Sequence, residues 1–432
     1  MESRSRSSFS LIRQSIPSPR RLIAAIPARW HWPIATFLMI VAVGYAFWPL
    51  HVRVRPWSDF GFIYAAGRTW LKGGSPYDFP TWNAEWAAIR PPSVVVSQPM
   101  PYMYPPHWAP LAVLAASLPW PVASRAWDAV SVLSFLATAL LSVNLLGSMG
   151  PGAIRRPGAW AAIAFAALNP AIHYSSWQSQ MALFPMLGVV GAFWAWHRKQ
   201  VAWLAVFGFI ASLKPQVSLP ALLFLFFSGG HVGLLLGGAA AVVVGVVAMM
   251  PSGLGAVPAQ VADCYARHVQ IVFNAPGEFS NLLAFFPWPG GTRPFLSVST
   301  ASGMVAGVAL AVAAREARRR HPALLPNSLW QLGIVTAATG ALMPVHAYDL
   351  VIYTPLFVLA YELRWRWVAT LVIVFSLLAS RLHFLAYVPM AQAGSWLTTA
   401  ILLTLAAGLL LRWRRVRLAT LPRPPPLPRF TL

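Results

Sequence analysis

Residues 57–78 read WSDFGFIYAAGRTWLKGGSPYD, and this stretch decides how the rest of the chain is interpreted. It follows the first long apolar run, residues 33–50, and it carries Asp59 and Asp78, two of the ten acidic residues of the chain. A carboxylate this close to a membrane segment is unfavourable unless it has a partner or a function. Asp59 is therefore the first candidate functional residue.

The composition indicates an integral membrane protein. Of the 432 residues, 58% are hydrophobic and 10% are charged, whereas soluble domains usually carry about 25% charged residues. A membrane-spanning helix needs about 20 apolar residues, so the chain has room for about ten or more spans. We therefore predict an all-α integral membrane protein.

The positive charge of the chain also points to a membrane. A formal net charge of +22 would suggest nucleic-acid binding in a soluble protein. Here the arginines form short blocks between apolar runs, as the positive-inside rule describes, which favours anionic lipid and no nucleic-acid partner. Cys264 is the single cysteine, which excludes an intrachain disulfide. The sequence also has no HExxH motif and no cluster of cysteine and histidine, so we expect no metal and no cofactor.

The arginine blocks set the predicted topology. We assign residues 1–31 to a basic cytoplasmic tail (a transit peptide is the alternative), residues 32–411 to one polytopic domain, and residues 412–432 to a basic, proline-rich cytoplasmic tail. Residues 51–107 are expected to form a long polar loop on the far side, and residues 108–120 a juxtamembrane or re-entrant helix that is too short to span. The expected spans are about 33–50, 126–148, 159–175, 181–196, 201–213, 217–229, 232–250, 296–314, 326–343, 350–362, 367–381 and 394–411. Every dense arginine block then falls on one side, which predicts about twelve spans with both termini cytoplasmic.

Polar residues gather at the far-side ends of these spans. The set comprises Asp59, the 169–180 loop, Lys214, the 263–281 loop, and the pair His346 and Asp349. Acidic residues on the cytoplasmic side are scarce by comparison. A functional site that faces the far side is therefore better supported than one that faces the cytoplasm.

Asp59 has two interpretations from residue type alone. Aromatic neighbours place its carboxylate in poor solvent, where it can act as a general base toward a bound hydroxyl group. Alternatively, Ser58 or Asp59 caps a helix that includes residues 65–71. Asp128, at the start of the second expected span, is expected to form a local ion pair with Arg125.

Lys214 lies between two short apolar runs and precedes Pro215, which predicts a broken helix. Irregular backbone at membrane depth is tolerated where it lines a cavity, and a lysine there can bind a phosphate group. The alternative is a lysine that extends to the membrane interface. Gln178 and Gln180 suit hydrogen bonds to sugar hydroxyls, although an ordinary polar loop has the same composition. His346 and Asp349 share a helical face, as a structural pair or as ligands of a phosphate or hydroxyl group.

The chain resembles a known family in its first half. The residues concerned are SDF…YAAG…L…GGSPYD within 58–78, Tyr104-Pro105-Pro106, Asn169-Pro170 with Gln178-Ser179-Gln180, and Leu213-Lys214-Pro215-Gln216. They resemble glycosyltransferase family 87, whose members are polyprenyl-phosphate-dependent membrane enzymes that include bacterial mannosyltransferases. The His346-Ala347-Tyr348-Asp349 segment is a weaker match.

The resemblance implies a GT-C bundle with its active site at the non-cytoplasmic face. It implies that Asp59 is the general base, Lys214 a ligand of the donor phosphate, and Tyr64 of the signature a further substrate-binding candidate. Gln178, Gln180, His346 and Asp349 complete the candidate substrate-binding set. The sequence departs from the family where Trp177 replaces the glycine of a common Gly-Gln pair.

The leading hypothesis is an inverting glycosyltransferase of the bacterial inner membrane. It would move mannose or another hexose or pentose from a polyprenyl-phosphate donor to an extracytoplasmic glycan or glycolipid. The alternatives are a transporter or flippase for a lipid-linked sugar, and a non-catalytic partner in an envelope-polysaccharide complex. A transporter is expected to have paired interrupted helices in related halves, and the sequence indicates only the break at Lys214.

Overall fold

A computed structural model describes most of the chain, and its regular elements are all helices. The described residues are 27–51, 58–89, 100–146, 155–320, 328–362, 392, 394–403, 405–406 and 408. The α-helices are α3 (Ala28–Phe47), α4 (Asp59–Leu71), α5 (Phe79–Ile89), α6 (Ala109–Ala116), α7 (Trp120–Leu145), α8 (Pro157–Ala167), α9 (Pro170–Trp177), α10 (Leu183–His197), α11 (Val201–Ser212), α12 (Pro215–Leu225), α13 (His231–Met249), α14 (Val257–His268), α15 (Thr292–Arg320), α16 (Ser328–Leu342) and α17 (Thr354–Glu362). Two 3₁₀-helices also matter for the site, η2 (Pro106–Trp108) and η10 (Ala347–Tyr353).

The apolar helices are those of a membrane protein. Within the described residues, four stretches are long and apolar enough to cross a membrane: Ala28–Leu50, Trp120–Leu145, Pro215–Ser252 and Thr292–Arg320. Six shorter apolar helices of 10–17 residues accompany them. The all-α class is therefore confirmed, whereas the number of about twelve spans stays a prediction. The expected span 367–381 lies outside the described residues, as does part of 394–411.

The longest apolar stretch, Pro215–Ser252, reverses direction near its middle. Trp108 donates a hydrogen bond from Nε1 to the Leu213 carbonyl (2.8 Å), just before α12 begins. Gly245, near the end of α13, lies against Pro106. Both ends of the stretch therefore lie at η2, and the chain turns between α12 and α13 at Gly229, which has φ of 101°. The reversal falls between the expected spans 217–229 and 232–250, whose crossing of the membrane stays a prediction.

The third expected span, 159–175, is wrong as a single helix. It consists of α8 and α9, which are separated at Asn169. Pro170 disfavours helical backbone at the preceding residue, and Asn169 has ψ of 113°. The Asn169 side chain accepts a hydrogen bond from the Ala171 amide (3.1 Å) and donates one to the Leu350 carbonyl (3.0 Å). The break therefore ties α9 to η10.

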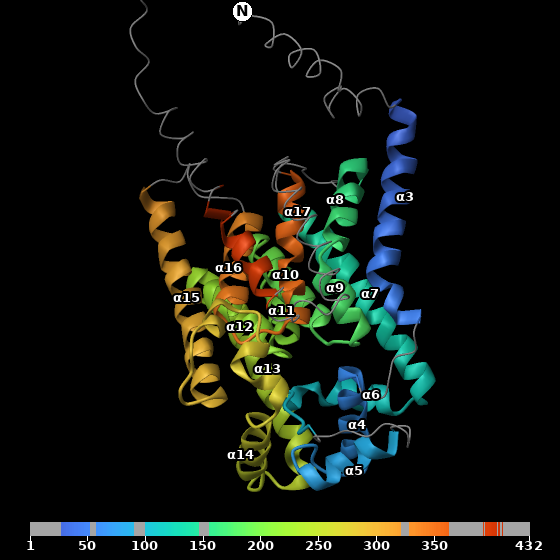
Figure 1. The fold of residues 1–432 in the computed structure, drawn as a ribbon, viewed down its shortest axis with the longest axis vertical. Coiled ribbons are helices and arrows are strands. Elements are labelled where there is room, and N and C mark those ends of the chain that lie inside the picture. The colour runs from blue at the N-terminus through green and yellow to red at the C-terminus, as the bar shows by residue number, and fades with distance from the viewer. Residues whose placement is uncertain are drawn as a thin grey trace, which may run out of the picture.

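The starts of α3 and α8 lie at the same end of the bundle. Trp32, near the start of α3, packs on Trp160, near the start of α8, with ring centroids 6.3 Å apart. Toward the other end, Tyr45 packs on His173 of α9, with centroids 5.3 Å apart. Figure 1 shows α4, α5, α6 and α14 together at the end opposite to the one where α3 begins. Arg29 near the start of α3 and Arg155 and Arg156 just before α8 thus lie away from α4–α6, although the orientation in a membrane stays a prediction.

Residues 58–89 and 100–116, most of which belong to the expected far-side loop, form a compact helical unit, and their side of the membrane stays a prediction. Its core is aromatic: Phe60, Trp82, Trp86, Tyr102 and Trp108 are each buried. Gly67 allows α4 to approach α6 closely, because a Cβ there would meet the Ala112 carbonyl oxygen at 2.0 Å. The predicted short helix within 108–120 is present as α6. Apolar packing therefore holds the start of α4, and with it Asp59, in a defined place.

Candidate active site

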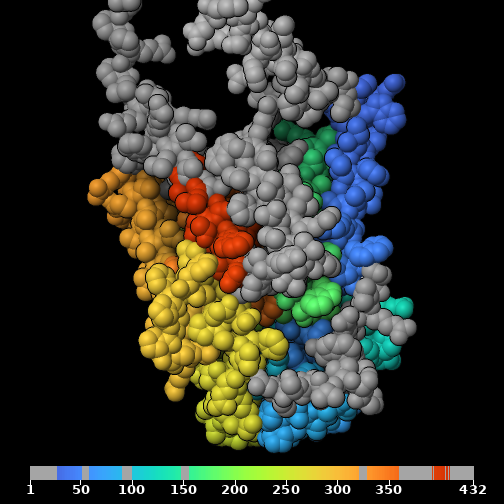
Figure 2. All heavy atoms as spheres, viewed as in Figure 1, coloured from blue at the N-terminus to red at the C-terminus, as the bar shows by residue number. Residues whose placement is uncertain are grey.

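A cavity of about 980 Å³ lies where the α4–α6 unit meets the bundle. Its walls come from the start of α4, the segment before η2, the loop after α9, the start of α12, the segment after α14, α15 and the segment before η10. Figure 2 shows the surface of α5, in light blue, beside that of α14, in yellow-green, at this end of the molecule. Elements that are far apart in sequence thus meet around one space.

Asp59 is the first residue of α4 and lines the cavity. Its Oδ2 accepts a hydrogen bond from the Tyr104 hydroxyl (2.8 Å), and its amide donates to the Gln178 carbonyl (3.3 Å). Burial raises the pKa of the Asp59 carboxyl above its ordinary value of 3.8, although the charge of Lys214 and the Tyr104 hydrogen bond oppose this shift. Ser58 precedes the helix but makes no side-chain cap hydrogen bond. A carboxylate with a raised pKa is a stronger base than an ordinary one.

Lys214 lies in the predicted break between α11 and α12, directly before Pro215. Its side chain is 3% exposed, and Nζ lies 2.6 Å from Oδ1 of Asp349, which is 0% exposed. Nζ also donates a hydrogen bond to Oε1 of Gln180 (3.1 Å) and lies 5.1 Å from the centre of the Tyr348 ring. The lysine is thus held by neighbours from two other segments while it lines the cavity.

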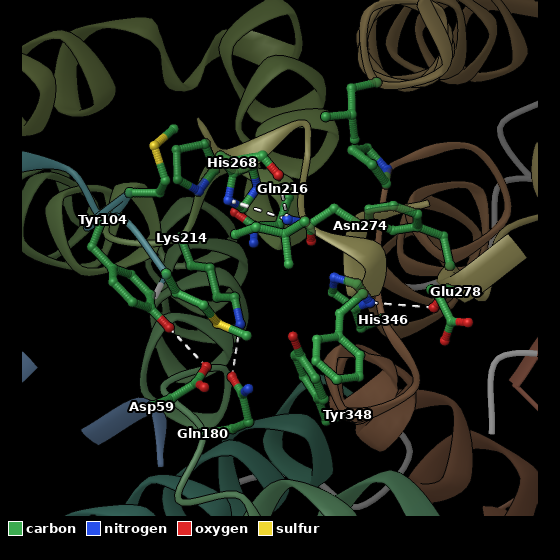
Figure 3. Close-up of a pocket in the computed structure, with 18 of the residues that line it drawn as sticks. Asp59, Tyr104, Gln180, Lys214, Gln216, His268, Asn274, Glu278, His346 and Tyr348 are labelled. Carbon is green, nitrogen blue, oxygen red and sulfur yellow. Dashed lines mark hydrogen bonds between the residues drawn. The ribbon is translucent and has the colours of Figure 1, made fainter. Parts of the chain in front are cut away.

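The segment before and at the start of η10 forms the facing wall. The His346 ring stacks on Phe279 with centroids 4.3 Å apart, and its Nδ1 lies 3.2 Å from the Glu278 carbonyl oxygen. The His346 amide donates to Oδ2 of Asp349 (3.1 Å). Figure 3 shows Asp59 and Tyr104 on one side, Lys214 and Gln180 beside them, and His346 and Tyr348 across the cavity.

The loop after α9 orients the two glutamines through an unusual backbone conformation. Ser179 has φ of 50°, in the left-handed region that residues other than glycine rarely adopt. Such a conformation costs on the order of 1–3 kcal/mol and persists where the surroundings impose it. Here Gln178 receives the Asp59 amide at its carbonyl, and Gln180 reaches Lys214. The loop after α9 therefore contacts both Asp59 and Lys214.

The structure brings most of the predicted site residues together. Asp59, Gln178, Gln180, Lys214 and His346 all line the cavity. Asp349 does not line it, because its carboxylate is buried beneath Lys214.

Two further predicted placements differ from the structure. The Tyr64 hydroxyl donates to the Leu118 carbonyl (2.9 Å) and its ring packs on Trp120, so Tyr64 lies in the aromatic core and outside the cavity. The expected ion pair between Asp128 and Arg125 is wrong, because Oδ1 of Asp128 is buried without a hydrogen-bond partner in the described part of the chain.

The cavity wall also contains residues that sequence reasoning did not single out, among them Tyr104, Tyr348, His268 and Asn274. Tyr104 and Tyr348 each belong to a motif that resembled the family, which was the available signal. His268 and Asn274 lie in a segment that was assigned to a loop, and nothing in their spacing indicates a shared wall. No group of three histidine, cysteine, aspartate or glutamate side chains that could hold a metal ion occurs among the described residues.

A comparison with protein families covers the region that contains part of this cavity. The profile of glycosyltransferase family 87 matches residues 102–343, more than half of the 432-residue chain. The match includes Tyr104, Gln178, Gln180 and Lys214, whereas Asp59 lies outside it. A search of curated proteins found no match. The match gives no support to the alternative of a transporter or flippase. The chain belongs to glycosyltransferase family 87, and it is a glycosyltransferase.

Proposed function

We propose that the protein is an inverting glycosyltransferase that moves a hexose or pentose from a polyprenyl-phosphate donor to a glycan or glycolipid acceptor. Asp59 acts as the general base. It takes the proton of an acceptor hydroxyl as the oxygen of that hydroxyl forms a bond to the anomeric carbon of the sugar. The bond between the anomeric carbon and the phosphate oxygen breaks, and polyprenyl phosphate leaves. The observation that carries this proposal is that Asp59 and Lys214 line one cavity.

The surroundings of Asp59 support its role as the base. Burial raises the pKa of the carboxyl, whereas the charge of Lys214 and the Tyr104 hydrogen bond stabilise the ionised carboxylate and so lower the pKa. The Tyr104 hydroxyl donates a hydrogen bond to the Asp59 carboxylate (2.8 Å), and the Asp59 amide donates one to the Gln178 carbonyl. A base that is fixed in this way can face a bound hydroxyl with little reorganisation.

The contacts of Lys214 support a role in binding the donor phosphate. An ammonium group has three N–H donors. Gln180 accepts one hydrogen bond from Nζ (3.1 Å), and the carboxylate of Asp349 lies 2.6 Å from Nζ as its counter-ion. N–H groups therefore remain for a phosphate oxygen, and His346 lines the same cavity. Lys214 can thereby stabilise the negative charge of the departing phosphate.

The place of the cavity supports an extracytoplasmic site, and the family resemblance is the basis for proposing a bacterial plasma membrane. Arg29 of α3 and the pair Arg155 and Arg156 before α8 lie where these two helices begin, at the end of the bundle away from α4–α6 (Figure 1). Basic residues favour the cytoplasmic side. We therefore infer that the cavity faces the opposite side, with both termini in the cytoplasm.

The test compares wild-type protein with Asp59→Asn. Each purified protein is incubated with a panel of polyprenyl-phosphate sugars and a bacterial lipid extract, and labelled product is measured. Wild type is expected to transfer one of the sugars, and Asp59→Asn to be slower by about 10²- to 10⁴-fold while it still binds polyprenyl phosphate. The control is Asp263→Asn, an exposed residue that pairs with Arg267 and is expected to transfer normally. Wild-type turnover by Asp59→Asn would contradict the proposal.

A further inference from the structure

One wall of the cavity has hydrogen-bonding groups that the proposed reaction does not use. His268 ends α14, Asn274 follows it, and Gln216 lies at the start of α12; all three line the cavity. Figure 3 shows the three side chains near one another along the side away from Asp59. These residues come from two segments that meet only in the folded protein.

The hydrogen bonds of Asn274 fix the direction of its amide. Nδ2 donates to the His268 carbonyl (2.8 Å) and approaches His268 Nδ1 at 3.3 Å. The other amide atom, Oδ1, must then be the acceptor that is left, and it has no hydrogen-bond partner among the described residues. Asn274 is only 7% exposed, so this unused acceptor belongs to a buried side chain that lines the cavity.

The hydrogen bond from Asn274 also fixes the tautomer of His268. Burial lowers the pKa of the His268 imidazole to about 4, and His346 adds to this shift, so the ring is neutral at pH 7. A neutral imidazole has one donor and one acceptor. Because Nδ1 accepts from Asn274, Nε2 carries the proton and is the donor.

The wall therefore combines a donor and an acceptor without charge. His268 supplies an N–H, Asn274 supplies a carbonyl oxygen, and the Gln216 amide supplies both. Within the described residues that line the cavity, Lys214 is the sole lysine or arginine, and it is already paired with Asp349. A uronate or a phosphorylated sugar would find no further cation to neutralise it, whereas sugar hydroxyls need only such neutral partners.

We propose that His268, Asn274 and Gln216 form a subsite that binds the hydroxyl groups of an uncharged sugar ring. The choice between the donor sugar and an acceptor sugar rests on the proposed function, but the recognition of a neutral sugar does not. Gln216 lies two residues after Lys214, so the subsite adjoins the place assigned to the donor phosphate.

The test uses His268→Phe, Gln216→Leu and the double variant. These changes remove the His268 Nε2 donor and the Gln216 amide, and they leave the bond from Asn274 Nδ2 to the His268 carbonyl in place. The control is Gln270→Ala, an exposed residue of the same segment that does not line the cavity. Melting temperatures close to that of wild type confirm that each variant is folded.

The first measurement is saturation-transfer NMR with a panel of neutral methyl hexosides and pentosides and with methyl glucuronide. Wild type and Gln270→Ala are expected to bind at least one neutral glycoside and to give no signal with the uronate. The double variant is expected to bind that glycoside at least tenfold more weakly, because it has lost two neutral hydrogen-bonding groups. Equal binding by the double variant, or binding of the uronate alone, would overturn the subsite.

The second measurement separates this inference from the proposed function and identifies the sugar. Decaprenyl phosphate, which carries no sugar, is expected to bind wild type and the double variant within about twofold. If wild type fails to bind it, the proposed donor is wrong while the glycoside result still decides the subsite. In turnover, a raised KM for the donor assigns the subsite to the donor sugar, and a raised KM for the acceptor assigns it to the acceptor sugar. An equal fall in affinity for decaprenyl phosphate and for glycosides would indicate general damage to the cavity and overturn the subsite.

Discussion

Asp59 and Asp349 are the same residue type beside the same cavity, yet their surroundings differ. Asp59 lines the cavity and accepts a hydrogen bond from Tyr104 at 2.8 Å. Asp349 is 0% exposed, lies 2.6 Å from Lys214 and accepts the His346 amide at 3.1 Å. One carboxylate faces the space where a substrate can bind, whereas the other is occupied by protein groups. The comparison shows that accessibility separates a candidate base from a carboxylate that positions its neighbours.

The largest expected effect is on stability, from Asp349→Asn. This change leaves the ammonium group of Lys214 buried without its counter-ion, and breaking a buried pair costs about 3–5 kcal/mol. We expect a correspondingly large fall in the free energy of unfolding, measured by denaturation in detergent. The double variant Lys214→Met/Asp349→Leu removes both charges and should recover much of the loss. Equal stability of Asp349→Asn and wild type would show that the charge of Asp349 contributes no more to the free energy of unfolding than that of Asp59.

The next effect concerns the pH dependence of transfer and the hydrogen bond from Tyr104. The rate of wild type should fall about tenfold per pH unit at acid pH, as the Asp59 carboxyl becomes protonated. Because burial raises the pKa of Asp59, this acid limb should begin above pH 3.8. Tyr104→Phe removes a hydrogen bond that lowers this pKa, so the acid limb should move to higher pH and the rate should fall about tenfold.

Tyr102→Phe is the matched control for Tyr104→Phe. Tyr102 packs beside Tyr104, with ring centroids 5.8 Å apart, and its buried hydroxyl has no hydrogen-bond partner in the described part of the chain. Its removal should leave the pH profile of transfer unchanged. The same shift of the acid limb in both variants would indicate that the aromatic core, and not the contact with Asp59, sets the profile.

The smallest expected effect is a gain in stability from Asp59→Asn. A raised pKa means that folding favours the protonated carboxyl. This contribution is fully present below pH 3.8 and is lost as the pH rises through the raised pKa. An amide is neutral throughout, so Asp59→Asn should stabilise the protein by about 1 kcal/mol at pH 7. The gain should vanish near pH 3, and a loss of stability at pH 7 would place Asp59 with Asp349 as a structural residue.

The sequence predicted features of the site that depend on local chemistry. Pro215 after Lys214 indicated the break between α11 and α12, and scarce acidic residues next to apolar runs drew attention to Asp59. The contacts that form the cavity wall depend instead on packing between segments that are far apart in the sequence. The hydrogen bond from Asn169 to Leu350 joins residues 181 positions apart, and that from Trp108 to Leu213 joins residues 105 apart. No local pattern specifies such pairs, so Tyr348 and Asn274 could not be placed before the fold was known.

The turn at Gly229 also marks how far Lys214 lies from the reversal of the chain. α12 has 11 residues, so it rises about 16 Å, roughly half of the hydrocarbon thickness of a bilayer. Lys214 directly precedes α12, and Gly229 follows its end. The length of this one short helix therefore sets the depth at which the lysine lies in the bundle, measured from the turn.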